Sequence, residues 1–96
     1  MPSSTQVKKR TTTEEAQRVG DAIGVDWEHF DLEQFRRGMD VEFEHGAHDP
    51  QTDVTGDDPI ITGKIALAHM KEFPDYYERL EKMEQEAERE WAAKKL

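Results

Sequence analysis

Residues 59–73 read Pro-Ile-Ile-Thr-Gly-Lys-Ile-Ala-Leu-Ala-His-Met-Lys-Glu-Phe, and this stretch decides the fold because it is apolar almost all round. At about 100° per residue on a helical wheel, Lys64 and Lys71 fall within roughly 20° of each other and mark the one polar edge. The opposite face carries Thr62, Ala66, His69 and Phe73. We therefore predict a central helix whose His69 imidazole points into the protein, where it needs a hydrogen-bonding partner.

Helix start signals place three further helices around this one. Thr13 and Asp31 are residue types that cap helix N-termini, and Asp75 is followed three residues later by Glu78, the pattern of a capping box. Asp58 caps the central helix, which has proline at its first position. The expected helices are 13–24, 32–45, 59–73 and 75–94. Because no strand signal or repeat accompanies them, we predict an all-α protein, a compact bundle of four helices.

The last expected helix carries an apolar stripe that is long for a small domain. Its members are Tyr76, Leu80, Met83, Ala87 and Trp91. The other faces hold Glu, Lys, Arg and Gln, which is typical of a solvated surface. We expect this helix to extend beyond the core. Since Trp91 then needs a surface to cover, dimerisation through this helix is a reasonable hypothesis.

Composition excludes several classes of protein. The chain has 96 residues and a net charge of −9, so it offers no general basic face for nucleic acid. No apolar run approaches the length of a membrane span, and the first residues lack the apolar segment of a signal peptide. We expect no membrane association and a cytoplasmic protein, or a virion protein if a phage encodes it. With no cysteine, disulfides and thiolate chemistry are excluded.

Two segments read as non-helical. Residues 1–12 are expected to form a flexible N-terminal arm that precedes a single helical domain at 13–96. Residues 46–58 form a long loop rich in aspartate, glycine and threonine. Its aspartates do not match an EF-hand calcium loop, because the glycine and glutamate positions of that pattern are not filled. Capping and turn roles account for them instead.

A pair of polar doublets is the strongest candidate for chemistry. Glu42 and His45 are three residues apart on one expected helix, and His69 and Glu72 are three apart on the central one. Glu42 falls inside an apolar stripe, and Gly38 on the same helix leaves room for another helix to approach. Two carboxylates and two imidazoles form a ligand set for a divalent metal: zinc, iron or manganese. The alternative is a buried hydrogen-bonded pair, His69 to Glu42, that ties two helices together without metal.

The sequence supports an enzymatic function less well than a binding function. The chain has no nucleophile motif, no cysteine and no glycine-rich phosphate loop. Large rings such as Trp27, Phe30, Tyr77 and Trp91 are numerous for so small a domain, and exposed rings commonly anchor protein contacts. The alternative places Trp27 and Phe30 as plugs at the end of the bundle.

Three motifs resemble one family of small bacterial and phage proteins, classed as a domain of unknown function. They are Glu-Phe-Glu-His-Gly at 42–46, Asp-Asp-Pro-Ile-Ile-Thr-Gly-Lys-Ile-Ala-Leu-Ala-His-Met at 57–70 and Glu-Phe-Pro-Asp-Tyr-Tyr at 72–77. The resemblance covers roughly residues 14–88 and assigns no catalytic residue. Its occurrence in phage genomes implies a virion or phage-accessory role.

Taken together, these patterns predict a small non-enzymatic accessory protein that acts through contacts with a protein partner or with itself. The alternative is a metal-binding protein that uses Glu42, His45, His69 and Glu72.

Overall fold

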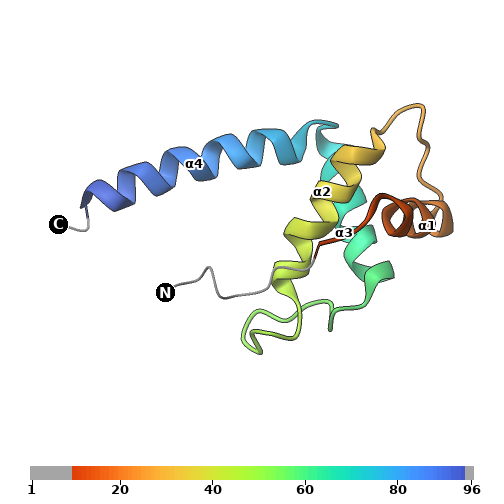
Figure 1. Cartoon of the computed structure of the whole chain (residues 1–96), viewed down its shortest axis with the longest axis horizontal. Helices are drawn as coiled ribbons and strands as arrows, with labels where there is room; N and C mark the ends of the chain where they lie inside the picture. The colour runs from red at the N-terminus through yellow and green to blue at the C-terminus, as the bar shows by residue number, and fades with distance from the viewer. Residues whose placement is uncertain (1–9, 95–96) are drawn as a thin grey trace.

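The computed structural model describes residues 10–94, and within this range the chain forms helices and no strands. The elements in order are α1 (Thr13–Ile23), α2 (Leu32–Glu42), a single 3₁₀ turn η2 (Phe43–His45), α3 (Pro59–Glu72) and α4 (Tyr76–Lys94). Helices α1, α2 and α3 pack into a globule, and α4 extends from one end of it (Figure 1). The predicted all-α fold with four helices is confirmed.

The predicted caps of α2 and α3 are confirmed. The carboxylate of Asp31 accepts a hydrogen bond from the Gln34 backbone N–H, and that of Asp58 accepts bonds from the first-turn N–H groups of Ile60 and Ile61. Each aspartate thus satisfies amide groups that have no partner inside the helix.

Other helix ends differ from the prediction by one to three residues. The cap of α1 is Thr12 rather than Thr13, because Thr12 and Glu15 exchange side-chain-to-backbone hydrogen bonds in a capping box. The predicted helix 32–45 is α-helical only to Glu42, after which the chain tightens into η2. Asp75, predicted to close a capping box, instead accepts a hydrogen bond from Arg79 Nε at 2.9 Å.

Phe73 is the clearest misplacement in the predicted central helix. Helix α3 ends at Glu72, and residue 73 adopts extended dihedral angles, as expected immediately before a proline. Its side chain therefore leaves the buried face and is 55% exposed. The wheel prediction is confirmed for Thr62 and Ala66, which are fully buried, and for Lys64 and Lys71, which are exposed. His69, also predicted to point inward, is only half-buried.

The core lies between α2 and α3, each of which contacts the other three helices. The predicted central place of α3 is confirmed, and α2 shares it. The buried apolar side chains are Ala16, Val19, Val25, Phe35, Met39, Phe43, Ala66, Met70 and Tyr77. Gly63 sets the distance between α1 and α3, because a Cβ there would lie 2.4 Å from Val19 Cγ1. A side chain at this position would push the two helices apart.

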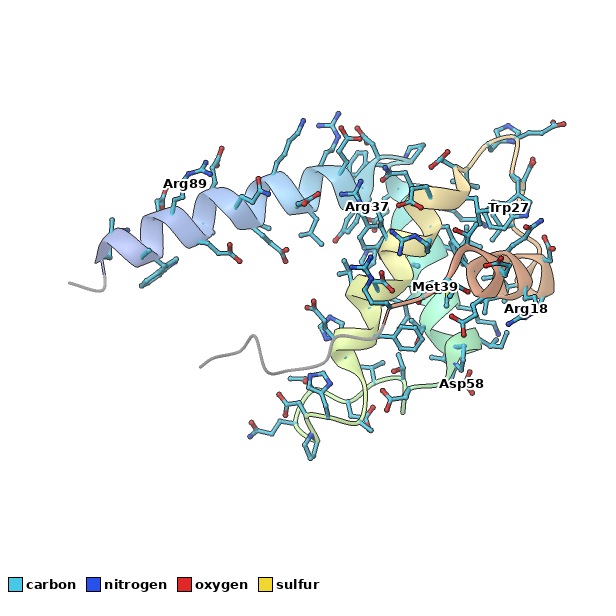
Figure 2. The ribbon with its side chains drawn as sticks, viewed as in Figure 1. Arg18, Trp27, Arg37, Met39, Asp58 and Arg89 are labelled. Carbon is cyan, nitrogen blue, oxygen red and sulfur yellow. The ribbon has the colours of Figure 1, made fainter. Side chains whose placement is uncertain are left out.

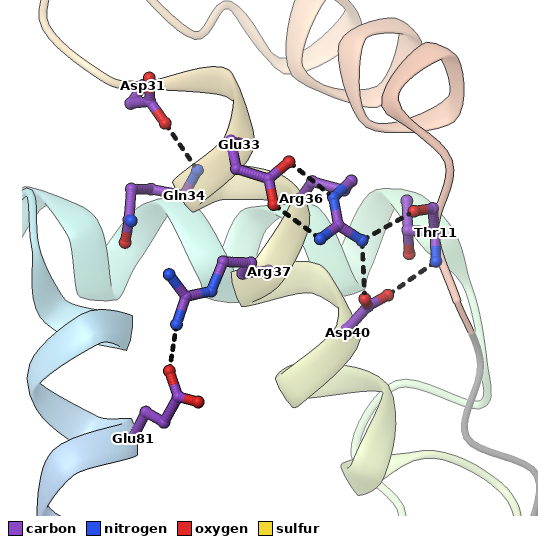
Figure 3. Close-up of polar contacts among 8 residues, drawn as sticks. All are labelled: Thr11, Asp31, Glu33, Gln34, Arg36, Arg37, Asp40 and Glu81. Atoms are coloured by element: carbon purple, nitrogen blue, oxygen red, sulfur yellow. Dashed lines mark hydrogen bonds and ion pairs between the residues drawn. The ribbon is translucent and has the colours of Figure 1, made fainter.

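The end of the predicted arm is packed against α2. Residues 1–9 lie outside the described residues, but Thr11 is buried. Its N–H donates to Asp40 Oδ1 at 2.7 Å, and its carbonyl accepts from Arg36 Nη1 at 3.2 Å (Figure 3). Arg36 also binds Asp40 and, through two nitrogens, Glu33. Thr11 and Thr12 of the predicted arm therefore belong to the folded domain.

The aspartates of the 46–58 loop make turns, as predicted. Asp57 Oδ1 accepts from the Ala47 N–H at 3.1 Å, and Asp53 Oδ1 accepts from the Gly56 N–H at 2.7 Å. The loop returns to the end of η2, where the Val54 N–H donates to the His45 carbonyl at 2.8 Å. These bonds hold the loop in place and start α3 in its observed direction.

Among residues 10–94, helix α4 touches the globule only through its first turns. Tyr77 is buried, Leu80 is half-buried, and Glu81 pairs with Arg37 of α2 (Figure 3). Beyond this pair the helix projects from the globule, with Arg89 on the projecting part (Figure 2). The expected extension beyond the core is confirmed. No helix within residues 10–94 combines the length and apolar character needed to cross a membrane.

Candidate functional site

The site predicted from the polar doublets centres on one buried carboxylate. Glu42, in the last turn of α2, is 4% exposed, and its Oε2 accepts a hydrogen bond of 2.7 Å from the Tyr77 hydroxyl. Tyr77 belongs to the first turn of α4 and is 2% exposed. A buried carboxylate without a donor is costly, so this bond satisfies Glu42 and fastens α4 to α2.

Gly38 makes room for this contact. It lies one turn before Glu42 on the same face of α2, and the Tyr77 ring rests against it. A Cβ at position 38 would lie 2.4 Å from Tyr77 Cε2. The predicted close approach of another helix at Gly38 is confirmed, and the approaching element is the start of α4.

Two imidazoles approach the same carboxylate from either side. His69 Nε2 lies 3.7 Å from Glu42 Oε2, and His45 Nε2 lies 3.8 Å from Glu42 Oε1. Both distances are longer than a hydrogen bond. Each pair is an ion pair only when the imidazole is protonated. The predicted direct hydrogen bond from His69 to Glu42 is therefore wrong, because the hydroxyl of Tyr77 takes that place.

His69 lies at the edge of the core rather than inside it. Its side chain is 33% exposed and stacks on the ring of Tyr76, with ring centroids 4.4 Å apart and planes at 15°. Its Nδ1 lies 4.0 Å from Glu72 Oε1, and the Glu72 side chain is 62% exposed. The structure thus brings Glu42, His45 and His69 together, with Glu72 on the outer side of the cluster.

No group of three or more Asp, Glu or His side chains within residues 10–94 is arranged to hold a metal ion. The long imidazole-to-carboxylate distances and the hydrogen bond from Tyr77 account for this. The metal-binding role of Glu42, His45, His69 and Glu72 stays a prediction.

Tyr77 is the residue of this cluster that sequence reasoning missed. It lies one position from the apolar stripe of α4, and from the sequence alone it stands out only as one of the large rings. The pattern that could have found it is Gly38 followed one turn later by Glu42, since a gap beside a buried acceptor fits a ring that ends in a hydroxyl.

Burial raises the pKa of Tyr77 far above its ordinary value of 10.0, and the hydrogen bond to Glu42 and the charge of that carboxylate act in the same direction. The hydroxyl is therefore a proton donor throughout the physiological range. The Tyr77 hydroxyl therefore keeps its proton rather than transferring it. Its hydrogen bond to Glu42 joins α4 to α2.

The two tryptophans have different surroundings. Trp27 packs over Gly20, makes an edge contact with Phe35 at 5.6 Å, and donates from Nε1 to Asp21 Oδ1 at 2.8 Å. It is half-buried, as the plug interpretation predicts. Trp91, in contrast, is 63% exposed on the projecting part of α4.

These features define a class: a small all-α protein with a three-helix core and a fourth helix fastened at one end. The family described as "Protein of unknown function (DUF5661)" matches residues 16–86. The chain therefore belongs to this family, which confirms the predicted resemblance to a domain of unknown function. The match includes the whole Glu42 cluster. No curated protein and no solved structure matches the chain.

Tyr77→Phe should lower the free energy of unfolding by about 1–3 kcal/mol, because it leaves the Glu42 carboxylate buried without its donor. The double variant Tyr77→Phe with Glu42→Met should recover at least half of this loss, since both polar partners are then removed. Urea denaturation measures both. The neighbouring Tyr76→Phe is the matched control and should change stability by less than about 0.5 kcal/mol. An equal loss of stability in Tyr77→Phe and Tyr76→Phe would contradict a stabilising role for the Tyr77–Glu42 hydrogen bond.

The raised pKa of Tyr77 also predicts a loss of stability in alkali. Above about pH 10 the unfolded state releases the tyrosine proton while the folded state keeps it, so the unfolded state binds fewer protons and unfolding becomes easier as pH rises. We expect the decline between about pH 9 and pH 11 to be steeper in the natural chain than in Tyr77→Phe, by up to about 1.4 kcal/mol per pH unit. Parallel declines would show that Tyr77 titrates normally.

Proposed function

We propose that this protein is a small non-enzymatic accessory protein that acts through protein–protein contacts made by distal α4, defined here as residues 83–94. The observation that carries this proposal is the exposure of Met83 (54%) and Trp91 (63%) on a helix that projects from the globule. With Ala87 between them, these side chains fall within about 80° of one another around the helix. They form one apolar stripe, the "distal stripe".

The distal stripe is suited to binding because the fold does not use it. A tryptophan offers about 150–250 Å² of largely apolar surface, and most of that of Trp91 is still exposed. Tryptophan is also among the commonest anchors of protein interfaces. Within the described residues, the buried core is built from α1, α2, α3 and the first turn of α4, together with Val25 and Phe43. Covering the distal stripe therefore leaves the core intact.

Two surface hollows support a non-enzymatic role. One, of about 390 Å³, lies between α1 and α3, and the other, of about 190 Å³, is lined by residues that include Thr11 and Phe43. Neither is lined by Glu42, His45 or His69, so the titratable cluster does not open into either hollow. The resemblance to small bacterial and phage proteins supports a phage-associated role, with the cytoplasm as the proposed location, or the virion if a phage encodes the protein.

Site-directed photo-crosslinking in the source cells tests this function. A benzoylphenylalanine at position 83 should give a covalent adduct with a protein, because that position belongs to the distal stripe. The same residue at position 85, which is exposed on another face of α4, is the matched control and should give none. Adducts at both positions, or at neither, would contradict a contact through the stripe.

A second candidate function is metal binding by the Glu42 cluster. What supports it is the convergence of two imidazoles, from η2 and from α3, on the two oxygens of one buried carboxylate. Imidazole and carboxylate are the donor types that zinc, iron and manganese share. In this candidate Glu72 is the outer ligand.

Elemental analysis by mass spectrometry, on protein purified without an affinity metal, tests the second candidate. It predicts near-stoichiometric zinc, iron or manganese in the natural chain and none in His69→Ala. His48→Ala, in the exposed part of the loop, is the matched control and should keep the metal. No metal in any of the three samples would end this candidate.

A further inference from the structure

The charges around the distal stripe follow a simple pattern. At about 100° per residue, Glu84 and Glu88 lie along one side of the stripe, and Glu86 and Glu90 lie along the other. All four are exposed. Of the two cations of distal α4, Arg89 falls on the opposite face (Figure 2). Lys94 falls at the end of the stripe, where its Nζ lies over the Trp91 ring, 5.5 Å from the ring centroid. The distal stripe is therefore an apolar strip with glutamates on both edges.

A second exposed apolar surface carries the opposite charge. The hollow between α1 and α3, here the "α1–α3 groove", is lined by residues that include Ile23, Ile60, Leu67 and Ala68 together with Lys64 and Lys71. Both lysines are exposed, and neither forms an ion pair with another residue in the range 10–94. This groove is an apolar surface with cations on it.

The two surfaces also match in length. From Ile60 to Lys71 the groove runs about 16 Å along α3, and from Met83 to Trp91 the stripe runs about 12 Å along α4, at about 1.5 Å per residue. A helix that lays an apolar stripe into a groove is a common mode of protein recognition. Opposite charges along the edges would fix its register.

We propose that distal α4 of one copy docks in the α1–α3 groove of a second copy. This inference rests on the proposed contact function of α4 and names the partner. The chain's own α4 does not fill its groove, because the Tyr77–Glu42 bond and the Glu81–Arg37 pair hold it against α2 and direct it away from α1 (Figure 1).

The proposed contact is head-to-tail. Each copy gives a stripe to one neighbour and a groove to another, so the contact generates chains or rings rather than a symmetric pair. Symmetric pairing of two α4 helices through the stripe is the competing arrangement. It would set glutamate edges against glutamate edges, which repel each other.

A charge exchange between full-length chains tests this proposal by analytical ultracentrifugation. One variant carries Lys64→Glu and Lys71→Glu in the groove, and the other carries Glu84→Lys and Glu88→Lys beside the stripe. In the natural chain we expect the mass to rise with concentration and to pass beyond a dimer. Each variant alone should associate at least about tenfold more weakly, because like charges then face each other. An equimolar mixture of the two should regain association, since each stripe again meets a groove of opposite charge.

Three results would overturn the proposal: a natural chain that stays monomeric, association that stops at a dimer and ignores the groove substitutions, or a mixture no stronger than its components. All four substituted positions are exposed, and circular dichroism verifies that the variants stay helical. The photo-crosslinking at position 83 separates the two proposals. An adduct with a different protein would overturn the self-docking inference and leave the contact function standing.

Discussion

The hydrogen bond from Tyr77 to Glu42 determines how α4 is placed on the three-helix core. A carboxylate placed on the inner face of α2 must find a donor, and the donor comes from the first turn of α4. Because Gly38 lets the ring approach α2 closely, α4 starts at one fixed position and in one fixed direction. The pair of Arg37 with Glu81 continues the same seam by one more turn. Everything beyond that turn is directed away from the globule.

This fastening explains why the polar cluster and the exposed helix occur in the same protein. His45 and His69 lie beside a carboxylate that already accepts a hydrogen bond from Tyr77, and they stay 3.8 Å and 3.7 Å from its oxygens and partly exposed. The cluster thus has a buried part, the hydrogen-bonded pair of Tyr77 and Glu42, and an outer part, the two imidazoles. The three-helix core is complete without distal α4, and the apolar side chains of that segment are left for contacts outside the core.

Local signals in the sequence predicted the elements well because caps act over a few residues. Asp31 and Asp58 offer their carboxylates to the next turn, and that needs no knowledge of the rest of the fold. The cap at Thr12 was missed by one residue because three consecutive threonines present equivalent hydroxyls. Phe73 was misplaced because the helical wheel was carried one residue too far, to a position that Pro74 forces into an extended conformation.

The site was harder to predict because periodicity does not give the angle between helices. Helical spacing predicted that Glu42 and His69 lie on facing surfaces. The structure confirms this, because His69 Nε2 lies 3.7 Å from Glu42 Oε2. Which side chain then reaches the carboxylate depends on how α4 crosses α2, and that depends on Gly38 and Tyr77, residues far apart in sequence. The periodicity of the α4 stripe is the same where its members are half-buried, as at Tyr76 and Leu80, and where they are exposed, as at Trp91.

The four glutamates beside the distal stripe have a second consequence, for the stability of the helix itself. Glu84 with Glu88, and Glu86 with Glu90, are like charges one turn apart, a spacing that weakens an α-helix. This segment also lacks the tertiary packing that supplies most helix stability in proteins. Cations that cover either edge relieve the repulsion, so occupation of the stripe and helix–coil balance are coupled. Covering the edges with cations would therefore stabilise the helix as well as the contact.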